Sequence, residues 1–333
     1  MTAPLRLGTR RSALALAQST HVADALVAAS GRQVELVPIV SEGDVSRASL
    51  VQLGGTGVFA TRLREALLAG ECDLLVHSLK DLPTTDPSGL TIAAIPVRED
   101  SRDVVVTRDG TPLHRLPPGS TVGTGSPRRV AQVRRHNPRL EVRDLRGNVD
   151  SRLGRVRDGE LDAVVLAAAG LSRLDILDSE KFGFEQLGLD EWPTAAGQGA
   201  LAVETRADAA SDLLDALAAL DHAATRIAVT AERTVLAELE AGCHAPVGVH
   251  AELRGGELRV RAIVYAPSGD RRLAVDRTES VHRGYIRLQG SGNGADAADG
   301  TDPIVRARGI GHAVAHRLLE RGAAGLVPRE SAP

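Results

Sequence analysis

Hydroxyl, amide and basic side chains follow several predicted strands of this 333-residue chain. The groups are Thr9-Arg10, Ser78-Leu79-Lys80-Asp81, Thr124-Gly125-Ser126-Pro127-Arg128-Arg129, Arg146-Gly147-Asn148 and Arg173. Ligands of open α/β sheets bind beyond the carboxyl ends of the strands, and helix N-termini offer free N–H groups to anions. Paired arginines and hydroxyls at such ends therefore predict a site for carboxylate or phosphate groups.

Arg128 and Arg129 stand at the predicted start of a helix, where Pro127 suits the first helical position. Positive charge is unfavourable at a helix N-terminus, so a bound anion would explain the pair. The alternative is an exposed first-turn pair with no ligand. Asp81 is the carboxylate of this set, and it is a candidate general acid or a stabiliser of a developing cation. Its alternative is an aspartate that caps a turn.

Cys243 lies in the sequence Glu-Ala-Gly-Cys-His-Ala-Pro, which predicts a loop after a helix. A loop cysteine can be reactive, whereas a buried one is usually inert. We therefore keep Cys243 as a candidate nucleophile, with a structural cysteine as the alternative, and assign Cys72 to the core. His77 and His244 have no metal-ligand spacing around them, so no metal site is predicted.

Charge is distributed unevenly along the chain. The net charge is −3, yet the segment from Arg102 to Arg157 contains 13 arginines and 5 acidic residues. This favours a local anion site over a basic surface field. Aromatic residues make up 2% of the chain, too few for the stacking that single-stranded nucleic acids need. Nearly all basic residues are arginine, and Lys80 and Lys181 are the exceptions.

The sequence also predicts the location of the protein. No stretch reaches the ~18 apolar residues of a membrane span. Thr9-Arg10-Arg11-Ser12 precedes an apolar run that is too short for a signal peptide. We read this run as the start of a helix and expect a cytoplasmic protein.

Predicted strands alternate with helices through the first two thirds of the chain, which favours βαβ units and a parallel sheet. The pattern restarts near residue 102, so a second α/β domain is expected at about 102–191. Residues 191–204 are predicted to be a return crossing, and alternating strands after Cys243 indicate a third, α+β domain. The predicted strands are 5–8, 34–40, 73–76, 90–97, 103–107, 121–123, 140–144, 163–166, 248–253, 258–265 and 272–279.

The ordered motifs of the chain resemble the porphobilinogen deaminase (hydroxymethylbilane synthase) family over nearly its whole length. They are LRLGTRRSALALAQ, GGTGVF, VHSLKDLP, VGTGSPRRVAQ, LRGNVDSRL, LAAAGLSRL, GQGAL and AGCHAPVG. The resemblance implies an α/β protein with two periplasmic-binding-protein-like (type II) α/β domains plus a C-terminal α+β domain. The implied boundaries are 1–99 with 197–220, then 100–196, then 221–333.

The resemblance further implies a cytoplasmic, monomeric transferase that joins four porphobilinogen molecules head to tail with loss of ammonia. Water then releases hydroxymethylbilane. A dipyrromethane cofactor, bound to Cys243 through a thioether, primes the chain, and Asp81 is the implied catalytic residue. The implied cofactor-binding residues are Ser78, Lys80, Thr124, Ser126, Arg128, Arg129 and Arg146, and the implied substrate-binding residues are Arg10, Ser12, Arg152, Arg173 and Gln198. Neither nucleic acid nor membrane is an implied partner.

The chain departs from the family pattern in three places. Thr56 replaces a lysine of the family's glycine loop, Gly125 replaces a hydroxyl residue, and residues 290–300 form a low-complexity insert. Two other functions are compatible with the residues alone. One is a non-catalytic carboxylate-binding protein on the same scaffold, and the other is a nucleic-acid binder that uses the basic segment.

Overall fold

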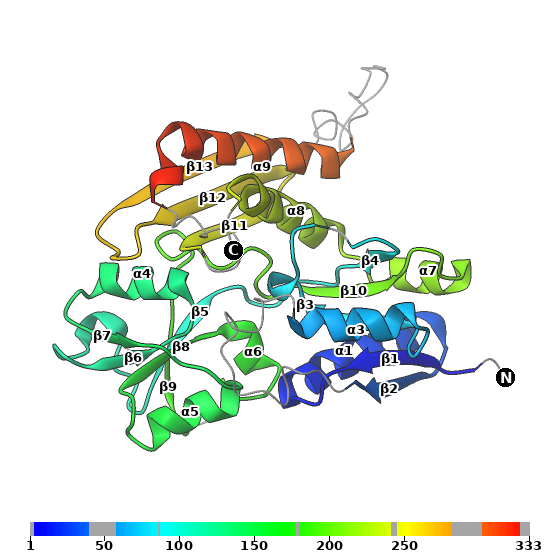
Figure 1. Cartoon of the computed structure of the whole chain (residues 1–333), viewed down its shortest axis with the longest axis horizontal. Helices are drawn as coiled ribbons and strands as arrows, with labels where there is room; N and C mark the ends of the chain where they lie inside the picture. The colour runs from blue at the N-terminus through cyan, green and yellow to red at the C-terminus, as the bar shows by residue number, and fades with distance from the viewer. Residues whose placement is uncertain are drawn as a thin grey trace, which may run out of the picture.

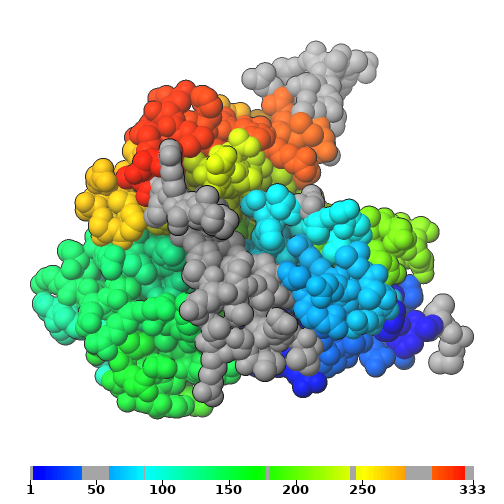
Figure 2. Space-filling model, in the orientation of Figure 1, coloured from blue at the N-terminus to red at the C-terminus, as the bar shows by residue number. Residues whose placement is uncertain are grey.

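Three β-sheets organise the part of the chain that the computed structural model describes, residues 3–39, 58–85, 87–177, 180–240, 245–281 and 302–326. The first two sheets lie side by side, and the third lies above them with its two helices (Figure 1). In the space-filling view the three units occupy different regions of this face, coloured mainly blue to cyan, green, and yellow to red (Figure 2). This arrangement confirms the predicted fold class.

The first sheet has the order β2-β1-β3-β10-β4. Its strands are β1 (Leu5–Thr9), β2 (Val34–Pro38), β3 (Leu74–Ser78), β4 (Leu90–Ala94) and β10 (Leu201–Arg206). The helices α1 (Ala13–Ser30), α3 (Val58–Leu68) and α7 (Ser211–Ala218) accompany it. Ser12 caps α1 through its side chain, and Gly31 ends it in the left-handed conformation at φ 68°, which glycine adopts without strain.

The second sheet repeats this plan in the order β7-β6-β8-β5-β9. Its strands are β5 (Asp103–Thr107), β6 (Thr121–Gly123), β7 (Glu141–Arg143), β8 (Ala163–Ala167) and β9 (Gly183–Gln186). Its helices are α4 (Pro127–His136), α5 (Val149–Arg157) and α6 (Ala168–Ser172), and η2 (Leu113–Arg115) is a short 3-10 turn. Every residue of β5 is buried, as its run of valines predicts.

The prediction of a parallel sheet was wrong for one strand of each sheet. β10 runs antiparallel to β3 and β4, and β5 runs antiparallel to β8 and β9. Each of these strands enters its sheet directly from the other unit. Residues 95–102 lead from β4 into β5, and residues 187–200 lead from β9 into β10. The return crossing predicted at 191–204 therefore ends in a sheet strand, because Leu201–Arg206 pairs between β3 and β4.

The third sheet is antiparallel, with the order β11-β12-β13. It consists of β11 (Val247–Arg254), β12 (Glu257–Tyr265) and β13 (Arg272–Ser280), and α8 (Ala223–Glu238) and α9 (Pro303–Glu320) cover it. The 3-10 turn η4 (Ala323–Gly325) follows α9. Apolar residues of both helices and all three strands form one core.

The third unit is joined to the crossing segments through Glu232 of α8. Arg98 donates two hydrogen bonds to the Glu232 carboxylate, at 2.7 and 3.0 Å. The amides of Gly197 and Ala251 donate to the same carboxylate at 2.6 and 2.7 Å. Glu232 is fully buried, so one carboxylate binds both crossings and β11 together.

Candidate active site

Several of the predicted site residues lie at or just beyond the ends of strands in the first two sheets. β1 and β3 are parallel neighbours in the first sheet, and β6 and β8 are parallel neighbours in the second. Their carboxyl ends lead to Arg10, Ser78, Thr124 and Arg173. The site is therefore assembled from the ends of strands in two units, as expected for open α/β sheets.

Lys80 and Asp81 belong to a single 3-10 turn, η1 (Leu79–Asp81), that directly follows β3. Leu79 is buried and anchors the turn, and its amide donates to the carbonyl of Ala200 at 3.0 Å. Lys80 is half-buried, whereas Asp81 is exposed. The turn therefore leaves Asp81 at the surface and Lys80 only partly accessible.

The ammonium of Lys80 donates to Oε1 of Gln198 at 3.2 Å. Burial lowers the pKa of Lys80 to about 8; Asp81 and Asp103 act in the opposite direction, while Arg129 and Arg128 lower it further. Lys80 therefore lies within electrostatic reach of both the Asp81 carboxylate and the arginine pair.

No hydrogen bond or ion pair joins Asp81 to another residue in the described ranges. The amide of Leu82 is bound by the carbonyl of Leu79, so the carboxylate does not cap the turn. The capping alternative for Asp81 thus has no support here. An exposed carboxylate next to an ammonium group can accept N–H donors from a ligand.

Arg128 and Arg129, at the start of α4, are both buried and share one counter-ion, Asp103. Arg128 Nη1 donates to Asp103 Oδ2 at 2.9 Å, and Arg129 Nη2 donates to Asp103 Oδ1 at 2.6 Å. Arg128 Nη1 also lies 2.6 Å from Gln132 Oε1 and 3.3 Å from the carbonyl of Pro193. Arg129 Nε is buried without a hydrogen-bond partner among the described residues. The exposed-pair alternative for these arginines is therefore wrong.

Asp103 was missed by the sequence analysis, which treated it only as the first residue of a strand. It is fully buried and also accepts from Trp192 Nε1 at 2.9 Å and Gln198 Nε2 at 2.8 Å. The sequence does contain a signal for it. Asp103 begins a strand of consecutive valines that is expected to be buried, and a buried carboxylate normally has a positively charged partner.

Gln198 connects the two units. Its Nε2 donates to the carbonyl of Ser101 and to Asp103, both at 2.8 Å, while its Oε1 accepts from Lys80. Arg173 also reaches the crossing, since its Nη2 donates to the carbonyl of Gly199 at 2.8 Å. Both residues are thus at the junction between the first two sheets.

Arg152 on α5 is half-buried and approaches the same charges. Its Nε donates to the carbonyl of Gly147 at 2.8 Å. Burial lowers the pKa of Arg152, as does Arg129, while Asp144 and Asp81 oppose this. The structure therefore brings together Lys80, Asp81, Arg129, Arg152 and Gln198.

The remaining predicted residues are positioned differently. Arg146 is exposed and pairs with Asp144 at 3.2 Å. Ser12 and Ser126 cap α1 and α4, with Oγ–N distances of 3.4 and 3.5 Å. Thr124 is buried and its Oγ1 accepts from the amide of Ser126 at 3.2 Å.

Ser78 Oγ accepts from Gln18 Nε2 at 2.9 Å, and Arg10 is half-buried. Cys243, the Gly54–Gly57 loop with Thr56, and the 290–300 insert lie outside the described residues. Within the described ranges there is no group of three or more potential metal ligands. No helix there is both long and apolar enough to cross a membrane.

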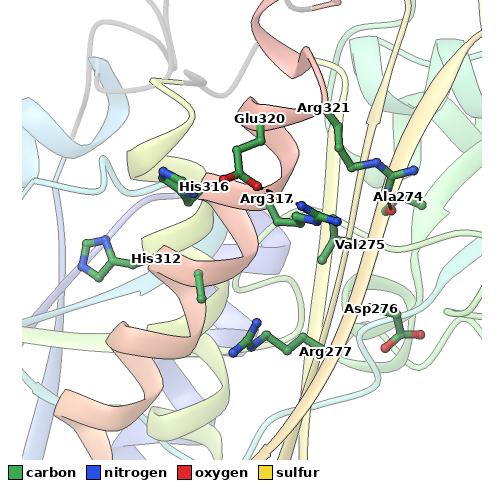
Figure 3. Close-up of a pocket in the computed structure, with 10 residues that line it drawn as sticks. Ala274, Val275, Asp276, Arg277, His312, His316, Arg317, Glu320 and Arg321 are labelled. Carbon is green, nitrogen blue, oxygen red and sulfur yellow. Dashed lines mark hydrogen bonds and ion pairs between the residues drawn. The ribbon is translucent and has the colours of Figure 1, made fainter.

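A groove of about 750 Å³ lies elsewhere, between β13 and α9 (Figure 3). Its cationic side chains already have partners: Arg317 pairs with Glu320 at 3.1 Å, and Arg321 Nη1 donates to the carbonyl of Ala274 at 2.6 Å. None of the predicted site residues in the described ranges lines this groove. The candidate active site is therefore the cluster around Asp81.

Two family models match the chain. The first, described as porphobilinogen deaminase, dipyromethane cofactor binding domain, covers residues 5–213. The second, described as porphobilinogen deaminase, C-terminal domain, covers residues 226–284.

Full-length relatives are similar. The chain is 50% identical to the porphobilinogen deaminase of Leifsonia xyli over 327 residues, covering 97% of this chain and 94% of that one. It is 49% identical to the enzyme of that name from Thermobifida fusca, covering 98% and 96% of the two chains. The Mycobacterium tuberculosis protein of that name is 48% identical, with coverage of 97% and 98%.

Solved structures with detectable likeness are more distant. The VFT2 domain of Bordetella pertussis BvgS is 18% identical, with a TM-score of 0.40 over 65% of this chain and 86% of that one. An ancestral arginine-binding protein bound to arginine is 18% identical, with a TM-score of 0.37 over 66% and 92%.

Proposed function

The chain belongs to the porphobilinogen deaminase family, and we propose that the cluster around Asp81 is the site of the family's reaction. The protein is a transferase of tetrapyrrole synthesis. It condenses four porphobilinogen molecules head to tail with loss of ammonia and releases hydroxymethylbilane by hydrolysis. The near-50% identity over almost the whole of each chain is the observation that carries this conclusion.

The charged residues of the site fit the substrate. Porphobilinogen carries acetate and propionate side chains, so a growing oligomer accumulates negative charge. Lys80, Arg129 and Arg152 lie in the same cluster and supply positive charge from both units. Guanidinium groups bind carboxylates through paired, charge-assisted hydrogen bonds. We assign substrate binding to Arg10, Ser12, Arg152, Arg173 and Gln198.

Asp81 is the catalytic residue that we assign. Loss of ammonia breaks the C–N bond of the aminomethyl group, both electrons leave with nitrogen, and a methylene-pyrrole cation remains. A carboxylate with no competing hydrogen bond from the described residues can bind the pyrrole N–H and stabilise that cation. Asp81 also protonates the departing amine when it carries the proton.

The chain has a dipyrromethane cofactor-binding domain, and the residues of the site fit that group. Arg129 Nε is buried and unpartnered among the described residues, and it lies in the first turn of α4, where the helix dipole favours anions. We propose that the cofactor is held by a thioether to Cys243 and by Ser78, Lys80, Thr124, Ser126, Arg128, Arg129 and Arg146. When bound, dipyrromethane supplies the free pyrrole carbon to which the first substrate unit is joined.

The domain boundaries, the oligomeric state and the cellular location of the protein are also part of this proposal. We divide the chain into residues 1–99 with 197–220, residues 100–196 and residues 221–333, and expect a cytoplasmic monomer. The pairing of β10 in the first sheet supports the discontinuous first domain.

The non-catalytic alternative makes a different prediction. A carboxylate-binding protein would bind porphobilinogen and leave it intact. The purified protein is expected to consume porphobilinogen and to release ammonia in equal amount, because every unit that is joined to the chain or retained on the protein loses its amine. Binding without release of ammonia would contradict the proposed function.

A further inference from the structure

We propose that Asp103 is a positioning residue of the site, which orients Arg128 and Arg129 and, through Gln198, the Lys80 ammonium. This inference rests on the proposed function, because it concerns the groups that we assign to cofactor and substrate binding. Asp103 is assigned no contact with the cofactor or the substrate. It acts through Arg128 and Arg129, which it binds.

Each carboxylate oxygen of Asp103 accepts two hydrogen bonds. Oδ2 accepts from Arg128 Nη1 and from Trp192 Nε1, both at 2.9 Å. Oδ1 accepts from Arg129 Nη2 at 2.6 Å and from Gln198 Nε2 at 2.8 Å. Four donors from α4 and from the 187–200 crossing therefore meet on one buried side chain.

The charge of Asp103 allows the two arginines to be buried together. Burial alone would raise the pKa of Asp103, but Arg128 and Arg129 outweigh this and hold the pKa well below its usual range. Asp103 therefore stays ionised at neutral pH and compensates one of the two guanidinium charges. The other guanidinium charge is not compensated by Asp103. In addition, Arg129 Nε has no hydrogen-bond partner among the described residues. Such a pair is prepared for an anion.

Gln198 transmits the orientation to Lys80. Its Nε2 faces three acceptors, the carbonyls of Ser101 and Arg102 and Asp103 Oδ1, so its Oε1 faces the other way. That oxygen accepts from Lys80 Nζ at 3.2 Å. Asp103 thus acts together with backbone carbonyls to set which end of the Gln198 amide faces the ammonium beside Asp81.

The substitution Asp103→Asn tests this role, because it keeps the size of the side chain and removes its charge. An amide has one acceptor oxygen and two N–H donors, so some of the four donors would face an N–H group. We expect kcat/KM for porphobilinogen to fall about 10- to 100-fold, chiefly through KM, since small displacements of binding groups have effects of that size. We also expect less cofactor on the protein, measured by intact mass.

The pH profile separates positioning from general loss of stability. The pKa of Lys80 is about 8, and the charges that face Lys80 are Asp81, Asp103, Arg129 and Arg128. Because Asp103 raises this pKa, Asp103→Asn is expected to move the alkaline limb of kcat/KM to lower pH. Asp103→Glu keeps the charge and moves the carboxylate by one methylene. Its alkaline limb should therefore lie at the wild-type pH, while its KM should remain above the wild-type value.

Glu204→Gln is the matched control. Glu204 is fully buried and pairs with Arg64 at 2.8 Å and with His77 at 3.2 Å, and it contacts no residue assigned to the site. It should lower the melting temperature but leave KM, cofactor mass and the alkaline limb unchanged. Trp192, the single tryptophan, reports unfolding by its fluorescence.

The results distinguish this inference from the proposed function. A wild-type protein that does not consume porphobilinogen would contradict the function itself. An active wild type together with an Asp103→Asn variant of unchanged KM, cofactor mass and alkaline limb would overturn only the role of Asp103. If Asp103→Asn does not fold, Asp103→Glu decides: a raised KM with the wild-type limb supports the role, and wild-type KM overturns it.

Discussion

Lys80 and Gln198 join the first unit to the crossing segment, because Lys80 Nζ donates to Gln198 Oε1 at 3.2 Å. The same ammonium lies beside Asp81 and the arginine pair, and its pKa is lowered, chiefly by burial, to about 8. The site therefore contains a cation whose charge changes within an accessible pH range.

The first prediction concerns pH. Lys80 is protonated below its pKa and loses its charge as the pH rises through about 8. Cofactor assembly from porphobilinogen by apo-protein should therefore slow above that pH, since a carboxylate binds less well without the ammonium. Lys80→Arg should flatten this decline, because arginine stays charged. An identical decline in Lys80→Arg would show that another group is responsible.

The second prediction concerns Asp81. Asp81→Asn should lower kcat by about 10²- to 10⁴-fold, the range typical for loss of an acid–base group. Asp81 is exposed and forms no hydrogen bond with a described residue, so the melting temperature should not change. Asp158→Asn, at the exposed end of α5, is the control and should retain wild-type kcat. Wild-type turnover by folded Asp81→Asn would refute the catalytic assignment.

The third prediction compares two arginines of the second unit. Arg128 is 3% exposed and is bound to Asp103, whereas Arg146 is exposed on the surface. Arg128→Leu should lower the melting temperature and block cofactor assembly, because it leaves Asp103 buried with less compensation. Arg146→Leu should leave the melting temperature unchanged and reduce the amount of cofactor on the protein. Calorimetry, intact mass and initial rates check these outcomes, and normal holoenzyme from Arg128→Leu would contradict them.

The fourth prediction concerns the link between the crossings and the third unit. Glu232→Ala removes a fully buried carboxylate and leaves the half-buried Arg98 without its partner, and breaking a buried ion pair costs about 3–5 kcal/mol. Thermal unfolding should show a clear fall in melting temperature. Glu279→Ala, on β13, removes a carboxylate of an exposed pair, and such pairs contribute about 0–1 kcal/mol. Equal melting temperatures for the two variants would be inconsistent with a structural role of Glu232.

The fold was largely predictable from the sequence because its strands and helices have strong local patterns. The valine run of β5 and the capped start of α4 are examples, and the ordered motifs indicated the family. Two strands were not predicted. β9 has only four residues, and β10 was read as part of a crossing because its pairing with β3 and β4 depends on contacts distant in sequence.

The candidate site was predictable in its residue types but not in its internal contacts. The cations at strand ends and Asp81 could be identified from their positions relative to predicted elements. The role of Asp103 depends on Trp192 and Gln198, which arrive from a different part of the chain. No local sequence pattern predicts these contacts, so the ion pairs of Asp103 with the two arginines could be identified only from the folded structure.

The intact mass of the purified protein tests the central claim most directly, namely that Cys243 holds a dipyrromethane at a site built for carboxylates. The wild type is expected to exceed the mass of its chain by one dipyrromethane, and Cys243→Ser is expected to have the mass of the chain alone. A wild type without the added mass, or a Cys243→Ser variant that retains it, would contradict the account.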